Sequence, residues 1–239
     1  MSVVLRSCLF AAFQIFITPP FAFIALLTFP FDPITRTRII GNWTRLVLWA
    51  VEFICGIRYR VVGAENIPTA PCVVLSKHQS AWETLAFQVI LPPQVYVIKR
   101  ELLWIPFFGW GLAMTSPVAI NRKAGMRALK QMLSQGKDRL RHGFWIIVFP
   151  EGTRIAPGQR GVYQTGGAAI AVHAGAPVVP VAHNAGTFWR RDAFLKYPGT
   201  ITVSIGKAID SRGRKADMIT REAETWIEAE MLRLENGRA

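Results

Sequence analysis

The chain has 239 residues, 51% of them hydrophobic, and 28 lysines and arginines against 15 acidic residues give it a formal net charge of +13. The apolar fraction is large enough to bury a core, which excludes a disordered polymer, and the length suits one domain with an apolar addition. The mean hydropathy of +0.27 is too low for a multi-pass membrane protein. Three widely spaced cysteines (Cys8, Cys55 and Cys72) support neither a disulfide framework nor a zinc site and favour a reducing compartment.

The N-terminal region is apolar. No charged residue occurs from Ser7 to Phe31, a run long enough for a membrane helix, which needs about 20 residues. Pro19 and Pro20 interrupt this run, and each removes an amide donor and disfavours helix at the residue before it. The two halves are each too short to span a membrane alone. A kinked span, a re-entrant hairpin, a pair of interfacial segments and a buried core helix therefore all remain open.

The next segment carries apolar residues at helical spacing, opposite a face shared by Arg45 and Glu52. The apolar positions are Trp43, Leu46, Val47, Ala50, Phe53, Ile54 and Ile57. We predict an amphipathic helix that packs on the following domain and also lies in the lipid interface, with Trp43 and Trp49 near the headgroups. Arginines follow the apolar run more often than they precede it, so a run that crossed the membrane would leave the main domain in the cytoplasm.

The rest of the chain alternates between strand and helix patterns. Short β-branched or apolar runs predict strands at Arg58–Val62, Pro71–Ser76, Gln94–Lys99, Pro117–Ile120, Phe144–Phe149, Pro177–His183 and Ile201–Ile205. Helical spacing predicts helices over 124–141, Gly167–Ala174 and Asp217–Glu235. This alternation implies an α/β fold with a mainly parallel central sheet flanked by helices. We divide the chain into an apolar, helical membrane-anchoring region, residues 1–57, and an α/β domain, residues 58–239.

The first candidate site follows the predicted strand Pro71–Ser76. His78 lies just beyond its carboxyl end, where open α/β sheets bind ligands. Ser80 and Glu83 have the spacing of a helix capping box. A break in the chain between His78 and Glu83 would let the carboxylate reach the imidazole, fix its tautomer and make it a general base. From the spacing alone, a simple helix cap beside an ordinary loop histidine is the stronger interpretation.

Two further segments carry groups that suit an anion. The turn Glu151-Gly152-Thr153-Arg154 follows the predicted strand Phe144–Phe149 and offers close backbone approach, a hydroxyl and a guanidinium. Lys99, Arg100 and Arg122 border a segment rich in tryptophan and phenylalanine, a mixture that suits a ligand with an anionic end and an apolar end. A turn with a surface salt bridge and an exposed basic loop are the corresponding structural alternatives.

These segments, taken in order, resemble the 1-acyl-sn-glycerol-3-phosphate acyltransferases of the glycerolipid acyltransferase family. In that family a His-x4-Asp block precedes a Lys-x-Glu-Leu…Pro…Gly…Arg block, a Phe-Pro-Glu-Gly-Thr-Arg block and an apolar Val-Pro-Val strand. The matching residues here are His78 with Glu83; Lys99, Glu101, Leu102, Pro106, Gly109 and Arg122; Phe149 to Arg154; and Val179 to Val181. The resemblance covers about residues 73–184, and four blocks in the family's order make it specific.

The resemblance implies transfer of a fatty acyl group from acyl-CoA or acyl-carrier protein to the 2-hydroxyl of lysophosphatidate, giving phosphatidic acid. His78 would act as the general base and Glu83 would stabilise its imidazolium. Arg154, supported by Lys99 and Arg122, would bind the acceptor phosphate. Glu151, Gly152 and Thr153 would shape that phosphate pocket. The family uses neither a metal nor a prosthetic group for this chemistry.

Two departures from the family pattern are visible. Glu83 replaces the usual Asp and keeps the carboxylate on a chain one methylene longer. Where many members carry Phe-Lys-x-Gly, this chain has Tyr163-Gln164-Thr165-Gly166 and lacks the lysine. The missing cation bears on the choice of acceptor, so another lysolipid such as a lyso-ornithine lipid stays an alternative.

Other classes of function fit less of the sequence. A basic, non-catalytic protein that binds nucleic acid or anionic lipid is one alternative. Binding to nucleic acid would leave the apolar N-terminal run unexplained. A metal hydrolase using His78 and Glu83 lacks further ligands, because the other histidines fall in helical patterns or near a strand end. Residues 94–160 contain 11 basic and 3 acidic side chains, close to the proposed site. We therefore expect an enzyme bound to anionic lipid at the cytoplasmic face of a membrane, in a bacterium the inner membrane, with no nucleic-acid partner.

Overall fold

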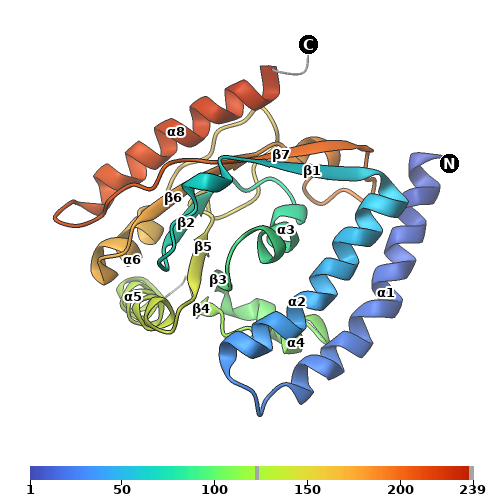
Figure 1. Cartoon of the computed structure of the whole chain (residues 1–239), viewed down its shortest axis with the longest axis horizontal. Coiled ribbons are helices and arrows are strands. Elements are labelled where there is room, and N and C mark those ends of the chain that lie inside the picture. Colours follow the sequence, from blue (N-terminus) through green and yellow to red (C-terminus); the bar gives the residue numbers. More distant parts are fainter. Residues whose placement is uncertain (122–123, 237–239) are drawn as a thin grey trace.

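The computed structural model describes residues 1–121 and 124–236. Its centre is a seven-stranded sheet with the order β1-β7-β6-β2-β5-β3-β4 (Figure 1). The strands are β1 Ile57–Val62, β2 Val73–Ser76, β3 Gln94–Lys99, β4 Val118–Ile120, β5 Trp145–Val148, β6 Val178–His183 and β7 Gly199–Ile205. All neighbouring strands run parallel except β6 and β7. The mainly parallel sheet predicted from the sequence is confirmed, with β1 and β7 running against the other strands.

Helices cover both faces of the sheet, which explains why β5 is apolar at every position and β2 at all but its last residue, Ser76. Side chains alternate between the two faces of a strand, and in β2 Val73 and Leu75 join the hydrophobic cluster of one face while Val74 joins that of the other. The first face packs against α5 (Met126–Arg141), α6 (Gly166–Ala174) and α8 (Ala216–Asn236). The second face packs against α3 (Trp82–Ile90) and the N-terminal helices.

Spacing along the sequence accounts for the helices of the first face. In α5 the buried residues Ala128, Met132, Gly136 and Leu140 recur every fourth position and form one stripe. Gly136 lets α5 approach α6 closely, because a Cβ at this position would lie 2.6 Å from Cγ2 of Ile170. These helices lie within two residues of their predicted bounds.

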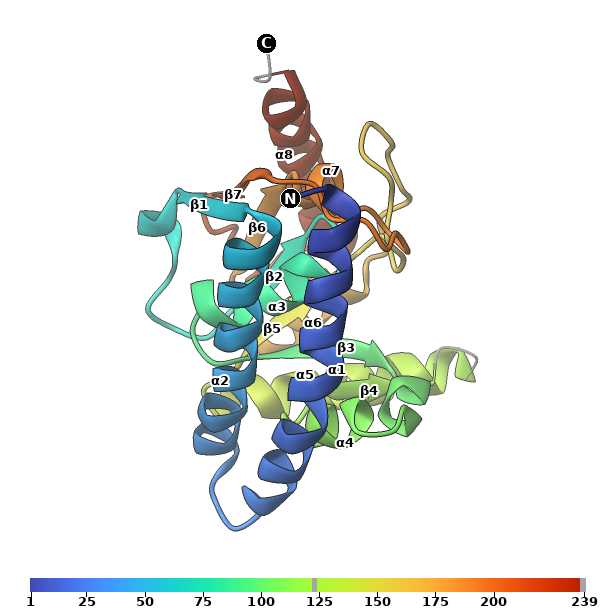
Figure 2. The same cartoon turned by 90° about the vertical axis from the view of Figure 1, so that its right-hand side faces the viewer.

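The N-terminal region forms a helical hairpin of α1 (Val3–Leu27) and α2 (Pro33–Ala50), which lie side by side in Figure 2. Pro19 and Pro20 lie inside α1, and the helix continues through them. A proline inside a helix costs roughly 3 kcal/mol through its lost hydrogen bond and ring clash. Packing of α1 against α2 and α4 (Phe108–Met114) offsets that cost. Among the described residues, α1 is the one helix long and apolar enough to cross a membrane.

The predicted amphipathic helix begins earlier than its apolar pattern indicated. Asp32 caps α2, since its Oδ1 accepts hydrogen bonds from the amides of Ile34 at 3.0 Å and Thr35 at 3.1 Å. The helix continues into a π-helical turn, Val51–Cys55, and ends at Gly56, which adopts a left-handed conformation with φ of 71°. The hairpin shares a core with the sheet, because Phe10 and Val47 belong to the same hydrophobic cluster as Val74.

The outer surface of the hairpin remains apolar. Exposed large side chains occur along α1 and beyond its C-terminus, among them Ile15, Phe16, Leu27 and Phe29. Phe53, predicted on the broad apolar side of the second helix, is exposed and stacks on Trp49 with ring centroids 5.4 Å apart. Part of the apolar pattern of the second helix therefore faces outward, and part is buried against the domain.

Short elements complete the fold. The 3-10 helix η3 (Arg100–Trp104) and α4 follow β3 and pack together, and α4 also contacts α1. The 3-10 helix η2 (Ala64–Asn66) follows β1, and α7 (Ala185–Phe188) follows β6. The sequence analysis predicted none of these elements. They matter because η3 and α4 form one wall of the cavity described next.

Candidate active site

The candidate residues gather at one edge of the sheet. His78 follows the carboxyl end of β2, the segment 149–154 follows β5, and Lys99 is the last residue of β3. These three strands are adjacent and parallel, so their carboxyl ends meet. Sequence segments more than 70 residues apart are brought together in this way.

His78 and Glu83 are in direct contact. The Nδ1 atom of His78 lies 2.8 Å from Oε1 of Glu83. The same oxygen accepts hydrogen bonds from the backbone amides of Gln79 at 2.9 Å and Ser80 at 2.8 Å, just before α3 begins at Trp82. Glu83 therefore caps the helix and contacts the imidazole at once, so the two arrangements weighed from the spacing do not exclude one another.

Electrostatics keep this carboxylate ionised. Burial alone would raise the pKa of Glu83, but the hydrogen bonds that its carboxylate accepts from His78 and from the amide of Ser80 hold that pKa below its ordinary value. An ionised Glu83 accepts the Nδ1 proton of His78, which leaves Nε2 as the nitrogen that can take up a proton. The ring of His78 also stacks on Phe149, with centroids 3.9 Å apart. The imidazole is therefore fixed in tautomer and in orientation.

A buried histidine, His183, lies behind the His78–Glu83 pair. The Nε2 atom of His183 lies 2.9 Å from the carbonyl oxygen of Lys77, and its Nδ1 accepts a hydrogen bond from the amide of Ala185 at 3.3 Å. Burial lowers the pKa of His183, so the ring is neutral, donates through Nε2 and accepts through Nδ1. The sequence analysis placed this residue near a strand end without a site role, and the structure places it behind Glu83, 4.0 Å from Oε1.

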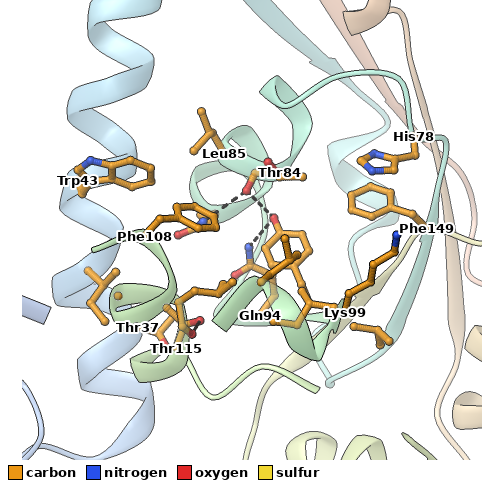
Figure 3. Close-up of a pocket in the computed structure, with 18 of the residues that line it drawn as sticks. Thr37, Trp43, His78, Thr84, Leu85, Gln94, Lys99, Phe108, Thr115 and Phe149 are labelled. Atoms are coloured by element: carbon orange, nitrogen blue, oxygen red, sulfur yellow. Dashed lines mark hydrogen bonds between the residues drawn. The ribbon is translucent and has the colours of Figure 1, made fainter. Parts of the chain in front are cut away.

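A cavity of about 480 Å³ opens beside His78 and extends toward the N-terminal hairpin. Figure 3 shows His78 and Phe149 at one end and Thr37, Trp43, Phe108 and Thr115 toward the other. Its walls come from α1, α2, α3, α4 and β3 and are mainly apolar. An apolar ligand that extends from His78 toward the hairpin suits this space better than a compact polar one.

The floor of the cavity contains a small hydrogen-bonded group. The hydroxyl of Tyr96 donates to the carbonyl oxygen of Thr84 at 2.9 Å and accepts from Nε2 of Gln94 at 3.2 Å. Burial raises the pKa of this hydroxyl, so Tyr96 stays neutral. These polar atoms are satisfied by one another, which leaves the aromatic ring to face an apolar ligand.

Cations border the cavity at the end near His78. Lys99, Arg154 and Arg191 all line it, as do the predicted residues Gly152 and Thr153. Nη1 of Arg154 lies 3.9 Å from Oδ1 of Asp192, which also pairs with Arg191. Arg122, the remaining predicted phosphate ligand, lies outside the described residues. The chemistry of this rim fits a phosphate group held beside the imidazole.

Glu151 lies differently from its predicted place in a phosphate pocket. Its carboxylate is buried and forms an ion pair with the ammonium of Lys77, with Oε1 and Nζ 2.7 Å apart. Its Oε2 accepts the backbone amide of His78 at 3.1 Å. With its oxygens engaged by Lys77 and by the main chain of His78, this carboxylate is not among the described side chains that line the cavity, whereas the next three residues, Gly152 to Arg154, are.

Several site residues lie outside the motifs used in the sequence analysis: Lys77, His183, Arg191 and Glu228. A lysine placed between a buried strand and a candidate general base is a signal that could have identified Lys77. The others come from distant elements with no local pattern. Only the tertiary structure brings these residues to the site, Glu228 from α8 and the others from the chain around β6.

Comparisons with known proteins identify relatives of this chain. Residues 58–184 match the model of the acyltransferase family. A 1-acyl-sn-glycerol-3-phosphate acyltransferase of Pseudomonas aeruginosa is 48% identical over 196 residues, 81% of this chain and 76% of the relative. The alpha form of Mus musculus is 30% identical over 209 residues, 85% of this chain and 73% of the relative.

The structure also resembles a solved one. The crystal structure of the 1-acyl-sn-glycerophosphate acyltransferase PlsC from Thermotoga maritima superposes with a TM-score of 0.77 at 22% identity, covering 98% of this chain and 95% of the other. This likeness confirms the predicted α/β fold with a mainly parallel sheet and an N-terminal apolar helix.

Proposed function

The chain belongs to the acyltransferase family, and we propose from this membership and the site that it transfers a fatty acyl group from a thioester to the 2-hydroxyl of 1-acylglycerol-3-phosphate, forming phosphatidic acid. The contact that carries this proposal is the 2.8 Å pair of His78 Nδ1 and Glu83 Oε1 at the end of an apolar cavity rimmed by cations. The site therefore brings together a base, an apolar cavity for an acyl chain and a rim that can bind phosphate. Both relatives described above are named as 1-acyl-sn-glycerol-3-phosphate acyltransferases.

The reaction proceeds by direct attack. Nε2 of His78 takes the proton of the acceptor hydroxyl as that oxygen bonds to the thioester carbonyl carbon. The imidazolium that forms is stabilised by the Glu83 carboxylate. When the carbon–sulfur bond breaks, the departing sulfur receives the proton from Nε2, which restores the base. This route involves no acyl-enzyme, metal or prosthetic group.

The acceptor phosphate and the acyl chain bind to different parts of the site. Arg154, with Lys99 and Arg191 on the same rim, binds the acceptor phosphate, and Gly152 and Thr153 border it. The apolar cavity binds an acyl chain. The donor is acyl-CoA or acyl-carrier protein, both of which present the acyl group as a thioester. The basic residues beside the cavity complement either donor, because both carry negative charge.

A product analysis tests the proposal. Purified protein is incubated with lysophosphatidate, a lyso-ornithine lipid and a monoacylglycerol, each with acyl-CoA and with acyl-carrier protein, and the products are identified by mass. We expect phosphatidate as the main product and no transfer by the His78→Ala variant. Preferred acylation of a lysolipid without phosphate would overturn the acceptor assignment. Undiminished transfer by His78→Ala would overturn the mechanism.

We also propose that the protein is held at the cytoplasmic face of a membrane, in a bacterium the inner membrane. The exposed apolar surface of α1, Trp49 and Phe53 supports attachment, and the excess of basic residues favours an anionic leaflet. High salt should release the protein only partly from anionic vesicles, because salt screens charge but not apolar insertion. Complete release by salt would refute a role for the apolar hairpin.

A further inference from the structure

A fully buried lysine immediately precedes His78. The side chain of Lys77 is 1% exposed, and three acceptors surround its ammonium. These acceptors are Oε1 of Glu151 at 2.7 Å, Oε1 of Glu228 at 2.9 Å and the carbonyl oxygen of Gln159 at 3.2 Å. An ammonium has three N–H donors, so this set satisfies all of them. A charge withdrawn from water requires such partners, and the transfer chemistry proposed above makes no direct use of this one.

The ion pair is connected to the main chain of His78. Glu151 accepts the amide of His78 at 3.1 Å, and the amide of Ile155 donates to the carbonyl oxygen of His78 at 2.7 Å. The segment 151–155 therefore holds the backbone of His78 on both sides. Because Arg154 belongs to the same segment, a shift of this loop would displace the general base and the phosphate-binding guanidinium together.

The third partner of the ammonium comes from the C-terminal helix. Glu228 lies on α8, beyond the region 58–184 that matches the family model. Its Oε1 accepts hydrogen bonds from Lys77 and also from the hydroxyl of Tyr163 at 2.7 Å. Glu228 thereby connects α8 both to the residue before His78 and to Tyr163, which lies near the end of the loop between β5 and α6, residues 149–165.

Two more contacts tie the same helix to the same loop. Nη2 of Arg160 lies 2.7 Å from Oε1 of Glu224, and the amide of Gly158 donates to Oε1 of Glu235 at 3.0 Å. Glu224, Glu228 and Glu235 share one face of α8, given the helical spacing of four and seven residues. The loop is therefore fastened to α8 along its length, with the buried Lys77 contact nearest to the reacting groups.

We propose that Lys77 and Glu228 are positioning residues of acyl transfer, through which α8 holds Glu151 and thereby keeps His78 and Arg154 in a fixed arrangement. This inference rests on the proposed function, since it assigns these residues a part in that reaction. Loss of the Glu228 contact should displace the imidazole, which lowers kcat, and displace Arg154, which raises KM for lysophosphatidate. The KM for the thioester should change less than the acceptor KM, because the apolar walls proposed to hold the acyl chain come from α1, α2, α3, α4 and β3, away from Glu228.

The test compares three variants on α8. Glu228→Ala removes the contact, and Glu228→Gln keeps an oxygen that can accept from Lys77 and Tyr163. Glu230→Ala is the matched control, because Glu230 is similarly buried, with its side chain 13% exposed against 18% for Glu228, and pairs with Arg233 of the same helix. All are assayed at a temperature at which circular dichroism shows them folded. We expect Glu228→Ala to lower kcat about tenfold or more and to raise the acceptor KM, with Glu228→Gln and Glu230→Ala within about threefold of wild type.

The outcomes separate the two proposals. A wild-type protein without activity on any lysophosphatidate would overturn the proposed function itself. If the wild type is active, the positioning role would be overturned by a folded Glu228→Ala variant with unchanged kcat and acceptor KM. An equal loss of activity in Glu230→Ala would also overturn it.

Tyr163→Phe keeps the inference testable if Glu228→Ala does not fold, because it removes only the hydroxyl that orients Glu228. We expect this variant to lower kcat by about threefold and to raise the acceptor KM in the same direction. Wild-type values of both constants in folded Tyr163→Phe, with Glu228→Ala unfolded, would mean that the buried ion pair supports the fold alone.

Discussion

Replacement of Glu83 by glutamine tests how much the carboxylate contributes to catalysis. The change keeps the size of the side chain and removes its charge, while the oxygen that meets His78 Nδ1 at 2.8 Å can still accept a hydrogen bond. Two unit charges at this separation interact by about 6 kcal/mol at an effective dielectric constant of about 20. The carboxylate meets an imidazolium only while the proton is on Nε2, so this interaction acts mainly on the transition state.

The amide recovers part of that interaction through its dipole. If it recovers about half, roughly 3 kcal/mol is lost, which corresponds to a decrease in kcat of about 100-fold. Glu83→Asp, which keeps the charge and restores the residue usual in the family, should retain more activity than Glu83→Gln. The shorter side chain must still reach Nδ1 and the amides of Gln79 and Ser80, so some loss is expected.

The assay is thioester consumption with lysophosphatidate as acceptor, measured for wild type, Glu83→Gln, His78→Ala and the double variant. Residues that act as one unit are not additive, so the double variant should be no slower than His78→Ala alone. Retention of kcat within about threefold in Glu83→Gln would refute the electrostatic argument. A double variant slower by the product of the two single effects would refute the claim that Glu83 acts through His78.

Three further predictions address other parts of the site. Arg154→Ala should raise KM for lysophosphatidate about tenfold or more, because a charge-assisted hydrogen bond contributes about 1.5–3 kcal/mol, and a loss confined to kcat at saturating acceptor would contradict phosphate binding. Gly111→Leu should shift donor preference toward shorter acyl chains in a chain-length series, because Gly111 lines the cavity and a Cβ added there would lie 3.9 Å from Cβ of Ala25, without a clash. An unchanged chain-length profile would place the acyl chain elsewhere. Burial lowers the pKa of His183, so below about pH 6.5 the unfolded chain binds a proton that the folded protein does not, and stability falls on acidification by at most about 1.4 kcal/mol per pH unit. His183→Gln should reduce that slope in urea unfolding between pH 7 and pH 5, and an equal slope would show that His183 is not the group responsible.

Local patterns in the sequence were sufficient for most of the sheet and for the choice of motifs. A strand buried on both faces is apolar throughout, and a helix with one buried stripe repeats every three to four residues, so β5 and α5 could be located from the residues alone. The order of motifs at strand ends similarly placed His78, Lys99 and Arg154 near one another, because parallel strands share a carboxyl edge. The motif order also predicted the family.

Other features depended on long-range packing. Pro19 and Pro20 predict a break, but the packing of α1 on α2 and α4 keeps one helix. The spacing of His78 and Glu83 left a helix cap and a catalytic pair as alternatives, and only the turn before α3 lets one oxygen serve both. Glu151 was placed in the phosphate pocket because its motif neighbours bind there, whereas the structure aims its carboxylate at Lys77.

The sequence by itself determined the residue types that the chemistry needs and the strand ends that present them. Only the tertiary structure decided which carboxylate faces the imidazole, which faces a buried lysine and which helix completes the set. The physical reason is that backbone periodicity is local and is written in neighbouring residues. The pairing of a buried charge instead depends on whichever group the fold brings within hydrogen-bonding distance, here Glu228, 151 positions from Lys77 along the chain.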